Sequence, residues 1–120
     1  MRSILLTVLV GLLLVPASAS AAGRFSGCVA ESVGCTHKFT SGSAPLVRFK
    51  DRQAANTRYR VCVKDRISRR CWKRKTGAAG HWDRAFPYYN ARDYGKHIVR
   101  WYVGGNEVAH WRFRLISEGD

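Results

Sequence analysis

The histidines, together with one glutamate and its neighbouring arginines, are the groups in this sequence whose types and spacing could support acid–base chemistry. The histidines are His37, His81, His97 and His110. An exported ribonuclease would use a His or Glu base, with arginines that stabilise the charge on the phosphate. Glu107, His110, Arg100 and Arg112 lie close together in the sequence. The chain contains no paired carboxylates, nucleophile elbow or phosphate-cradling glycine loop. We therefore assign no catalytic residue and expect a protein that is not an enzyme.

Positive charge is the strongest compositional signal, because the chain carries a formal net charge of +13. Two sets of residues concentrate it. The first set belongs to the last predicted hairpin and consists of Arg100, Tyr102, His110, Arg112 and Arg114. The second set surrounds a cysteine and consists of Arg69, Arg70, Lys73, Arg74 and Lys75. Cationic surfaces with exposed rings hold phosphates and stack on bases or sugars. The alternative is that both sets are ordinary solvated strand faces.

Four cysteines, an even number in a short chain with an export signal, predict two disulfides. Spacing favours the local pairs Cys28–Cys35 and Cys62–Cys71 among the three possible connectivities. A metal site could recruit Cys28, Cys35 and His37, but their spacing is not that of a zinc knuckle. We expect no metal ion and no cofactor.

Residues 96–115 form the strongest predicted element, a β-hairpin of two alternating runs around Gly104, Gly105 and Asn106. A three-residue loop with Asn106 in the left-handed region pairs Trp101 with Ala109 and matches the apolar positions of the two runs. Glu107 then faces inward and His110 outward. The predicted apolar side carries Val99, Trp101, Val103, Trp111, Phe113 and Leu115. The opposite side carries Ile98, Val108 and the first basic set.

Several shorter strands precede the hairpin. Residues 44–50 predict one strand, with Pro45 tolerated at its start. Residues 58–64 alternate, with Tyr59, Val61 and Val63 inward. If Val61 pairs with Trp72 on the returning strand, Cys62 stands opposite Cys71, so apolar matching and cysteine matching select one register. Residues 36–40 and 81–89 each predict a further short strand. The spacing favours an all-β sandwich of six to seven strands, with an open barrel as the second choice.

The start of the chain reads as a secretory signal peptide, with Arg2 before an apolar run and small residues near position 22. An uncleaved N-terminal anchor is the alternative. The predicted organisation is a signal peptide at 1–22, a Cys loop and linker at 23–43, a β-sandwich at 44–116 and a tail at 117–120. We expect a secreted, extracellular protein.

The pattern resembles the immunoglobulin-like β-sandwich superfamily and is similar to small Arg-rich exported proteins of high-GC bacteria. Trp72 resembles the buried Trp of strand C. Residues 93–99 look like the corner motif of the family, with His97 at the Tyr position, and the final hairpin looks like the F–G hairpin. Val61 and Val99 take the places of the two inter-sheet cysteines, so the cross-sheet disulfide is absent. The resemblance implies an antiparallel immunoglobulin-like sandwich.

Together these features predict a secreted, non-catalytic binding or surface-interaction module. Its expected partner is an anionic polymer, such as a cell-wall polymer, a polysaccharide or a nucleic acid, or another secreted or envelope protein. A small secreted hydrolase such as a ribonuclease is the first alternative. A cationic antimicrobial protein is the second.

Overall fold

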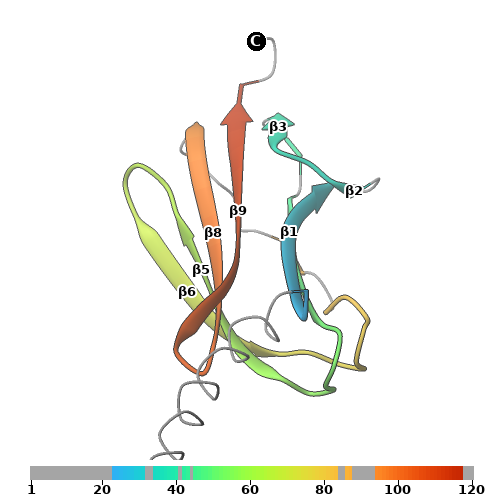
Figure 1. The fold of residues 1–120 in the computed structure, drawn as a ribbon. Coiled ribbons are helices and arrows are strands. Elements are labelled where there is room, and N and C mark those ends of the chain that lie inside the picture. Colours follow the sequence, from blue (N-terminus) through green and yellow to red (C-terminus); the bar gives the residue numbers. More distant parts are fainter. Residues whose placement is uncertain are drawn as a thin grey trace, which may run out of the picture.

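Two β-sheets make up the part of the chain that the structure, a computed structural model, describes, namely residues 23–31, 34–40, 42–43, 45–83, 86–87 and 94–117 (Figure 1). The strands are β1 (Phe25–Glu31), β2 (Gly34–Cys35), β3 (Lys38–Thr40), β4 (Leu46–Asp51), β5 (Arg58–Lys64), β6 (Arg69–Lys75), β7 (Phe86–Pro87), β8 (Gly95–Val103) and β9 (Asn106–Ile116). One sheet has the order β2-β1-β4-β7, and the other has the order β3-β9-β8-β5-β6. The predicted all-β class and two-sheet arrangement are confirmed, with more strands than the six or seven expected.

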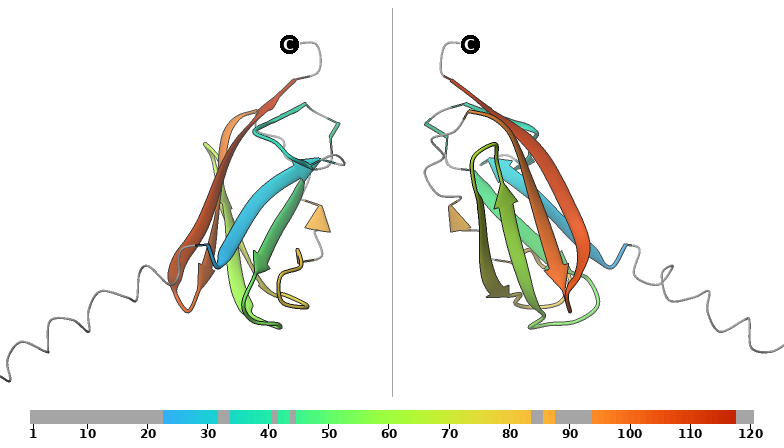
Figure 2. Two further views of the ribbon diagram at one scale, coloured as in Figure 1. Left: turned by 45° about the vertical axis from the view of Figure 1, so that its right-hand side comes forward. Right: turned by 90° about the vertical axis from the view of Figure 1, so that its left-hand side faces the viewer.

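The core lies between the two sheets, which the left-hand view of Figure 2 shows as two layers side by side. Strand alternation builds it, because successive side chains point to opposite faces of a sheet. Val29 and Phe49 contribute from the first sheet, and Val61, Trp101 and Phe113 from the second, all at most 3% exposed. The clean alternation of residues 58–64 therefore predicted the inward side chains of β5 correctly.

The segment 23–43, expected to be a Cys loop and linker, supplies three strands. β1 pairs antiparallel with β4 along six residues, and β3 pairs parallel with β9. Hydrogen bonds fix the connection between them, since Trp111 Nε1 donates to the Thr36 carbonyl at 2.8 Å and Arg114 N donates to the His37 carbonyl at 2.9 Å. The sandwich therefore begins at Phe25. The strand predicted over residues 36–40 is present as β3, whereas β1 and β2 were not predicted, because this segment lacks a long alternating run.

Glycine at position 27 lets β1 cross Trp101 at close range. A Cβ built on Gly27 would lie 2.5 Å from the nearest indole carbon, closer than carbon atoms can approach. Trp101 is completely buried on β8, so the ring has no free space into which it could move. The distance between the two sheets at this point therefore depends on the absence of a side chain on β1.

We expect Gly27→Ala to lower the free energy of unfolding by about 1–3 kcal/mol, because overpacking a filled core forces side chains and backbone apart. Denaturant unfolding followed by tryptophan fluorescence measures it. Gly77→Ala is the matched control, since no atom lies within 4 Å of the position of its Cβ. Equal stabilities of the two variants would show that the contact between Gly27 and Trp101 is not tight in solution.

The predicted hairpin forms, with Trp101 opposite Ala109, Val99 opposite Trp111 and His97 opposite Phe113 as expected. The predicted loop is wrong. Val103 pairs with Asn106, so the loop consists of Gly104 and Gly105 alone, with φ of 59° and 86°. A two-residue type I′ turn requires positive φ at both central residues, which two glycines supply without steric cost. Asn106 lies in β9 and does not adopt the left-handed region.

A β-bulge reconciles the short loop with the predicted core register. The pairing shifts between Trp101 and Tyr102, so Tyr102 faces Glu107 while Trp101 faces Ala109, and Val108 is the extra residue. A bulge places two residues of one strand opposite one residue of the other, which confines the shift to the hairpin end. Glu107 was predicted to face inward. The bulge moves it to the outer side, opposite Tyr102.

Both predicted disulfides are present. Cys28–Cys35 joins β1 to β2, and Cys62–Cys71 joins β5 to β6. Val61 pairs with Trp72 and Cys62 with Cys71. This is the register that was predicted by placing apolar residues opposite each other and cysteines opposite each other. Two disulfides in a small domain fit an extracellular protein. None of the described residues belongs to a helix that is long and apolar enough to cross a membrane.

Two details expected from the resemblance differ in the structure. Trp72 is only half-buried, because it lies on the edge strand β6 where one side has no neighbouring strand. Val61 and Val99 lie on adjacent strands of the same sheet, so they cannot occupy positions that face each other across the two sheets. The predicted signal peptide at 1–22, the residue Asp93 of the corner motif and the end of the tail lie outside the described residues.

Candidate anion-binding face

Basic side chains from four neighbouring strands lie together on the outer side of the five-stranded sheet. Strand alternation places Arg58, Arg60 and Lys64 of β5 on the side opposite the buried Tyr59, Val61 and Val63. Residues that are directly opposed on antiparallel strands point to the same face of the sheet. The partners of these three residues on the neighbouring strands therefore also point outward. We call this surface the basic face. Its charged members are Arg58, Arg60, Lys64, Arg69, Lys73, Lys75, Lys96, Arg100, Arg112, Arg114 and Glu107. The right-hand view of Figure 2 looks onto it.

Cations stand directly opposite one another across the basic face. Arg58 pairs with Lys75, Arg60 with Lys73, and Lys64 with Arg69. Lys96 likewise pairs with Arg114 on the two strands of the hairpin. Like charges that are directly opposed destabilise a sheet. Among the described residues, Glu107 is the one acidic side chain on the strands of this face. On these strands a single carboxylate therefore accompanies many cations, and the directly opposed cation pairs remain repulsive.

The two basic sets predicted from the sequence largely merge into this one face. All five members of the hairpin set lie on it: Arg100, Tyr102, His110, Arg112 and Arg114. From the second set, Arg69, Lys73 and Lys75 lie on it. They meet because β5 pairs with β6 on one side and with β8 on the other.

Arg70 and Arg74 do not belong to the basic face. Their strand partners are the buried Val63 and Tyr59, so both side chains start from the opposite side of β6. Arg74 Nε lies 3.1 Å from Asp83 Oδ2, and the Tyr59 hydroxyl donates a short hydrogen bond to the same carboxylate. Burial and this contact raise the pKa of Tyr59 above its usual value, so the hydroxyl keeps its proton. Arg74 therefore pairs with a carboxylate inside the fold.

Arg58, Arg60, Lys64 and Lys96 are the basic residues of this face that were not assigned as candidate site residues from the sequence. The signal for the first three was present, because they alternate with the inward residues of β5. Their position in the middle of a sheet depends on pairing with β8, which lies more than 30 residues away in the sequence. Such long-range pairing leaves no local sequence pattern.

The bulge brings Glu107 beside two basic groups of the hairpin. Glu107 Oε1 lies 3.1 Å from Arg100 Nε, and Glu107 Oε2 lies 3.5 Å from His110 Nδ1. These three side chains are between 39% and 51% exposed. Neither of the two depressions described below includes Glu107 or His110 in its lining. The acid–base group considered from the sequence therefore does form, but on an open surface.

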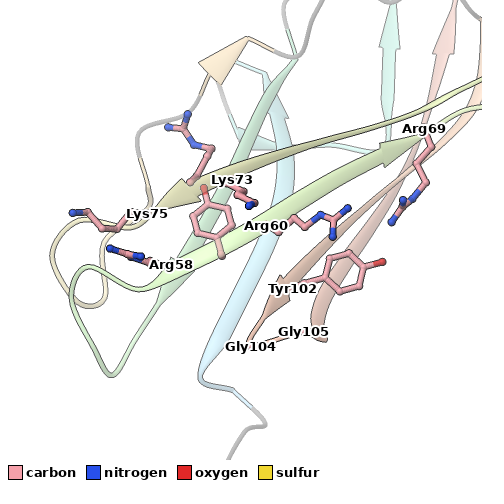
Figure 3. Close-up of a pocket in the computed structure, with 10 residues that line it drawn as sticks. Arg58, Arg60, Arg69, Lys73, Lys75, Tyr102, Gly104 and Gly105 are labelled. Atoms are coloured by element: carbon pink, nitrogen blue, oxygen red, sulfur yellow. The ribbon is translucent and has the colours of Figure 1, made fainter.

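Two depressions lie on the basic face, one towards each end of β8. The hairpin-end depression, with a volume of about 740 Å³, is lined by Arg58, Arg60, Arg69, Lys73, Lys75 and Tyr102 and reaches Gly104 and Gly105 (Figure 3). Tyr59 and Arg74, which start from the other side of the sheet, also contribute to its lining. The strand-start depression, with a volume of about 750 Å³, contains Tyr94, Lys96, Ile98, Arg100, Arg112 and Arg114. Its lining also includes one carboxylate, that of Asp65, whose side chain is largely buried. Both volumes fall in the range of small-molecule sites, about 300–1,000 Å³.

The described residues contain no cluster of His, Cys, Asp and Glu that could hold a metal ion. Comparison of the chain with protein-family models, with curated proteins and with solved structures finds no match. The functional argument therefore rests on the geometry and charge of the basic face.

Proposed function

We propose that this protein is a secreted, non-catalytic module that binds an anionic polymer through the basic face. The observation that carries the proposal is the direct opposition of cations on adjacent strands, as between Arg60 and Lys73. A bound polyanion would remove this repulsion by placing negative charge between the cations. The proposal gives a function to an arrangement that otherwise only lowers stability.

Protection of a sheet edge is the main structural explanation for such cations, since charged edge strands prevent aggregation. It applies to β6, which is an edge strand. It does not apply to Arg58, Arg60 and Lys64 of β5 or to Arg100 of β8, because both strands lie inside the sheet. The first sheet offers a contrast. Arg48 and Lys50 of β4 lie 4.9 and 4.6 Å from the Trp82 ring, which partly satisfies their charges.

The test compares two double variants that lose equal charge from different sheets. Arg60→Gln with Lys73→Gln should elute from an immobilised polyanion such as heparin at clearly lower salt than the unchanged protein. Its melting temperature should stay equal or rise, because an opposed pair of like charges is removed. Arg48→Gln with Lys50→Gln is the matched control and should elute close to the unchanged protein. Equal loss of retention in both variants would mean that net charge, and not the basic face, causes retention.

The sheet order also supports an immunoglobulin-like version of the sandwich, which we include in the proposal. Strands β9, β8, β5 and β6 would correspond to strands G, F, C and C′, and β1, β4 and β7 to strands of the opposing sheet. In this correspondence β5, and not the strand of Trp72, takes the place of strand C. The fold alone implies no function.

One observation favours a second candidate, a small hydrolase such as a ribonuclease. The bulge places Glu107 within 3.5 Å of His110 and 3.1 Å of Arg100, which supplies a base and a phosphate-binding cation. This candidate predicts RNA cleavage by the oxidised protein that His110→Ala abolishes. RNA that is bound without being cleaved would leave only the binding function.

A further inference from the structure

Each depression on the basic face combines cations with an apolar or aromatic side chain. In the hairpin-end depression, Tyr102 stands directly opposite Arg60 on the neighbouring strand, and Figure 3 shows its ring beside the Arg60 and Arg69 side chains. In the strand-start depression, Tyr94 is 49% exposed and Ile98 contributes apolar surface. A ligand without rings would use only the charged half of either depression.

The two depressions lie along one strand. Tyr94 directly precedes β8 and Tyr102 lies near its end, so eight residues separate them, or about 26 Å at the rise of an extended strand. Arg100 lies between them, opposite Cys62 on the neighbouring strand. A single extended polymer that runs parallel to β8 can therefore reach both tyrosines and pass Arg100 on the way, two residues before Tyr102.

We propose that the polymer is a single-stranded nucleic acid, with phosphates held by the arginines and lysines and bases stacked on Tyr102 and Tyr94. The inference rests on the proposed function and deepens it by naming the class of polymer. Unpaired bases present flat faces that stack on tyrosine whatever their identity. A duplex hides those faces. Arginine, which outnumbers lysine on the basic face, matches two phosphate oxygens and also stacks on planar rings.

The direct test uses two polymers with the same phosphodiester backbone. Fluorescence anisotropy compares an oligothymidylate with an abasic oligomer of equal length, both long enough to span the face. The oligothymidylate should bind at least about five times more tightly, the lower limit for one stacked base. Polyphosphate and heparin are measured in parallel as an anionic chain without rings and as an acidic polysaccharide with saturated rings.

Variants of Tyr102 separate stacking from charge. Tyr102→Leu should weaken binding of the oligothymidylate by about fivefold or more and leave binding of the abasic oligomer unchanged. Tyr102→Phe keeps the ring and should retain the affinity. Ile67→Ala is the control, because Ile67 is 75% exposed and lines neither depression. The same loss with both polymers would indicate a damaged fold or a purely electrostatic role, and would overturn the stacking proposal.

The outcomes distinguish the two proposals. Equal affinity for the oligothymidylate, the abasic oligomer and polyphosphate would overturn the inference and leave polyanion binding intact. Tighter binding of heparin that Tyr102→Leu does not change would assign the face to an acidic polysaccharide. Failure to bind any of the four polymers would overturn the proposed function itself.

Discussion

The affinity of the oxidised protein for a polyanion is expected to fall about a thousandfold between roughly 50 and 200 mM salt, if about six cations of the basic face each contact an anionic group. The cause is counterion release. A polyanion holds condensed cations that the protein displaces on binding, and added salt makes this release less favourable. The measurement is a titration by fluorescence anisotropy at several salt concentrations, with the logarithm of the affinity plotted against the logarithm of the salt concentration.

The slope of that plot reports how many cations take part. Each cation that is removed from the contact should lower the magnitude of the slope by about one, so Arg60→Gln with Lys73→Gln should lower it by about two. The control pair on the first sheet, Arg48→Gln with Lys50→Gln, should leave the slope unchanged. An affinity that does not respond to salt would contradict an electrostatic interface, whatever the affinity itself.

The local chemistry of the sequence predicted much of the hairpin and of the β5–β6 ribbon. Val61 opposite Trp72 and Cys62 opposite Cys71 could be predicted because two independent constraints selected one register. The hairpin loop was mispredicted for an instructive reason. A one-residue shift of register moves every side chain of a regular strand to the other face, but the bulge at Val108 confines the shift to the hairpin end.

The candidate site was predicted in parts but not as a whole. The sequence indicated which side chains of the hairpin face outward, because their alternation is local. It could not indicate that Arg100 and Lys73 share a face, since that depends on β5 pairing with both β6 and β8. Nor could it separate Arg74 from its neighbours, because the partner of Arg74 is Asp83, which lies in a different part of the fold.

We expect Asp51→Asn to lower the free energy of unfolding by about 2–3 kcal/mol at neutral pH, because the buried carboxylate loses its charge-assisted hydrogen bonds and an amide group cannot accept from all of the same donors. Asp51 is 1% exposed and accepts two hydrogen bonds of 2.9 Å from the Arg24 guanidinium. The Thr57 hydroxyl and the backbone amides of Gln53 and Ala54 also donate to its carboxylate. This carboxylate therefore ties the start of β1 to the turn that follows β4.

Urea unfolding measures the effect, and Glu107→Gln serves as the matched control. Glu107 also pairs with an arginine, but its side chain is 40% exposed. Exposed pairs contribute at most about 1 kcal/mol, so the control should remain close to the unchanged protein. If Asp51→Asn cost no more than Glu107→Gln, the buried network would not hold the two segments together in solution.

Because of the same hydrogen bonds to Asp51, the stability of the fold should decrease at low pH. The Arg24 guanidinium lowers the pKa of Asp51 well below its usual range, with the Thr57 hydroxyl and two backbone amides adding to the effect against the opposing influence of burial. In the unfolded chain the pKa is about 3.9. The contribution of Asp51 is therefore complete above that pH. It is lost as the pH falls below about 3.9 towards the lower folded-state pKa, because the unfolded chain takes up the proton first. The difference in free energy of unfolding between the unchanged protein and Asp51→Asn should therefore become smaller over that pH interval, since the other carboxylates affect both proteins alike. A gap that stays constant from pH ~6 to pH ~2.5 would show that folding does not lower this pKa.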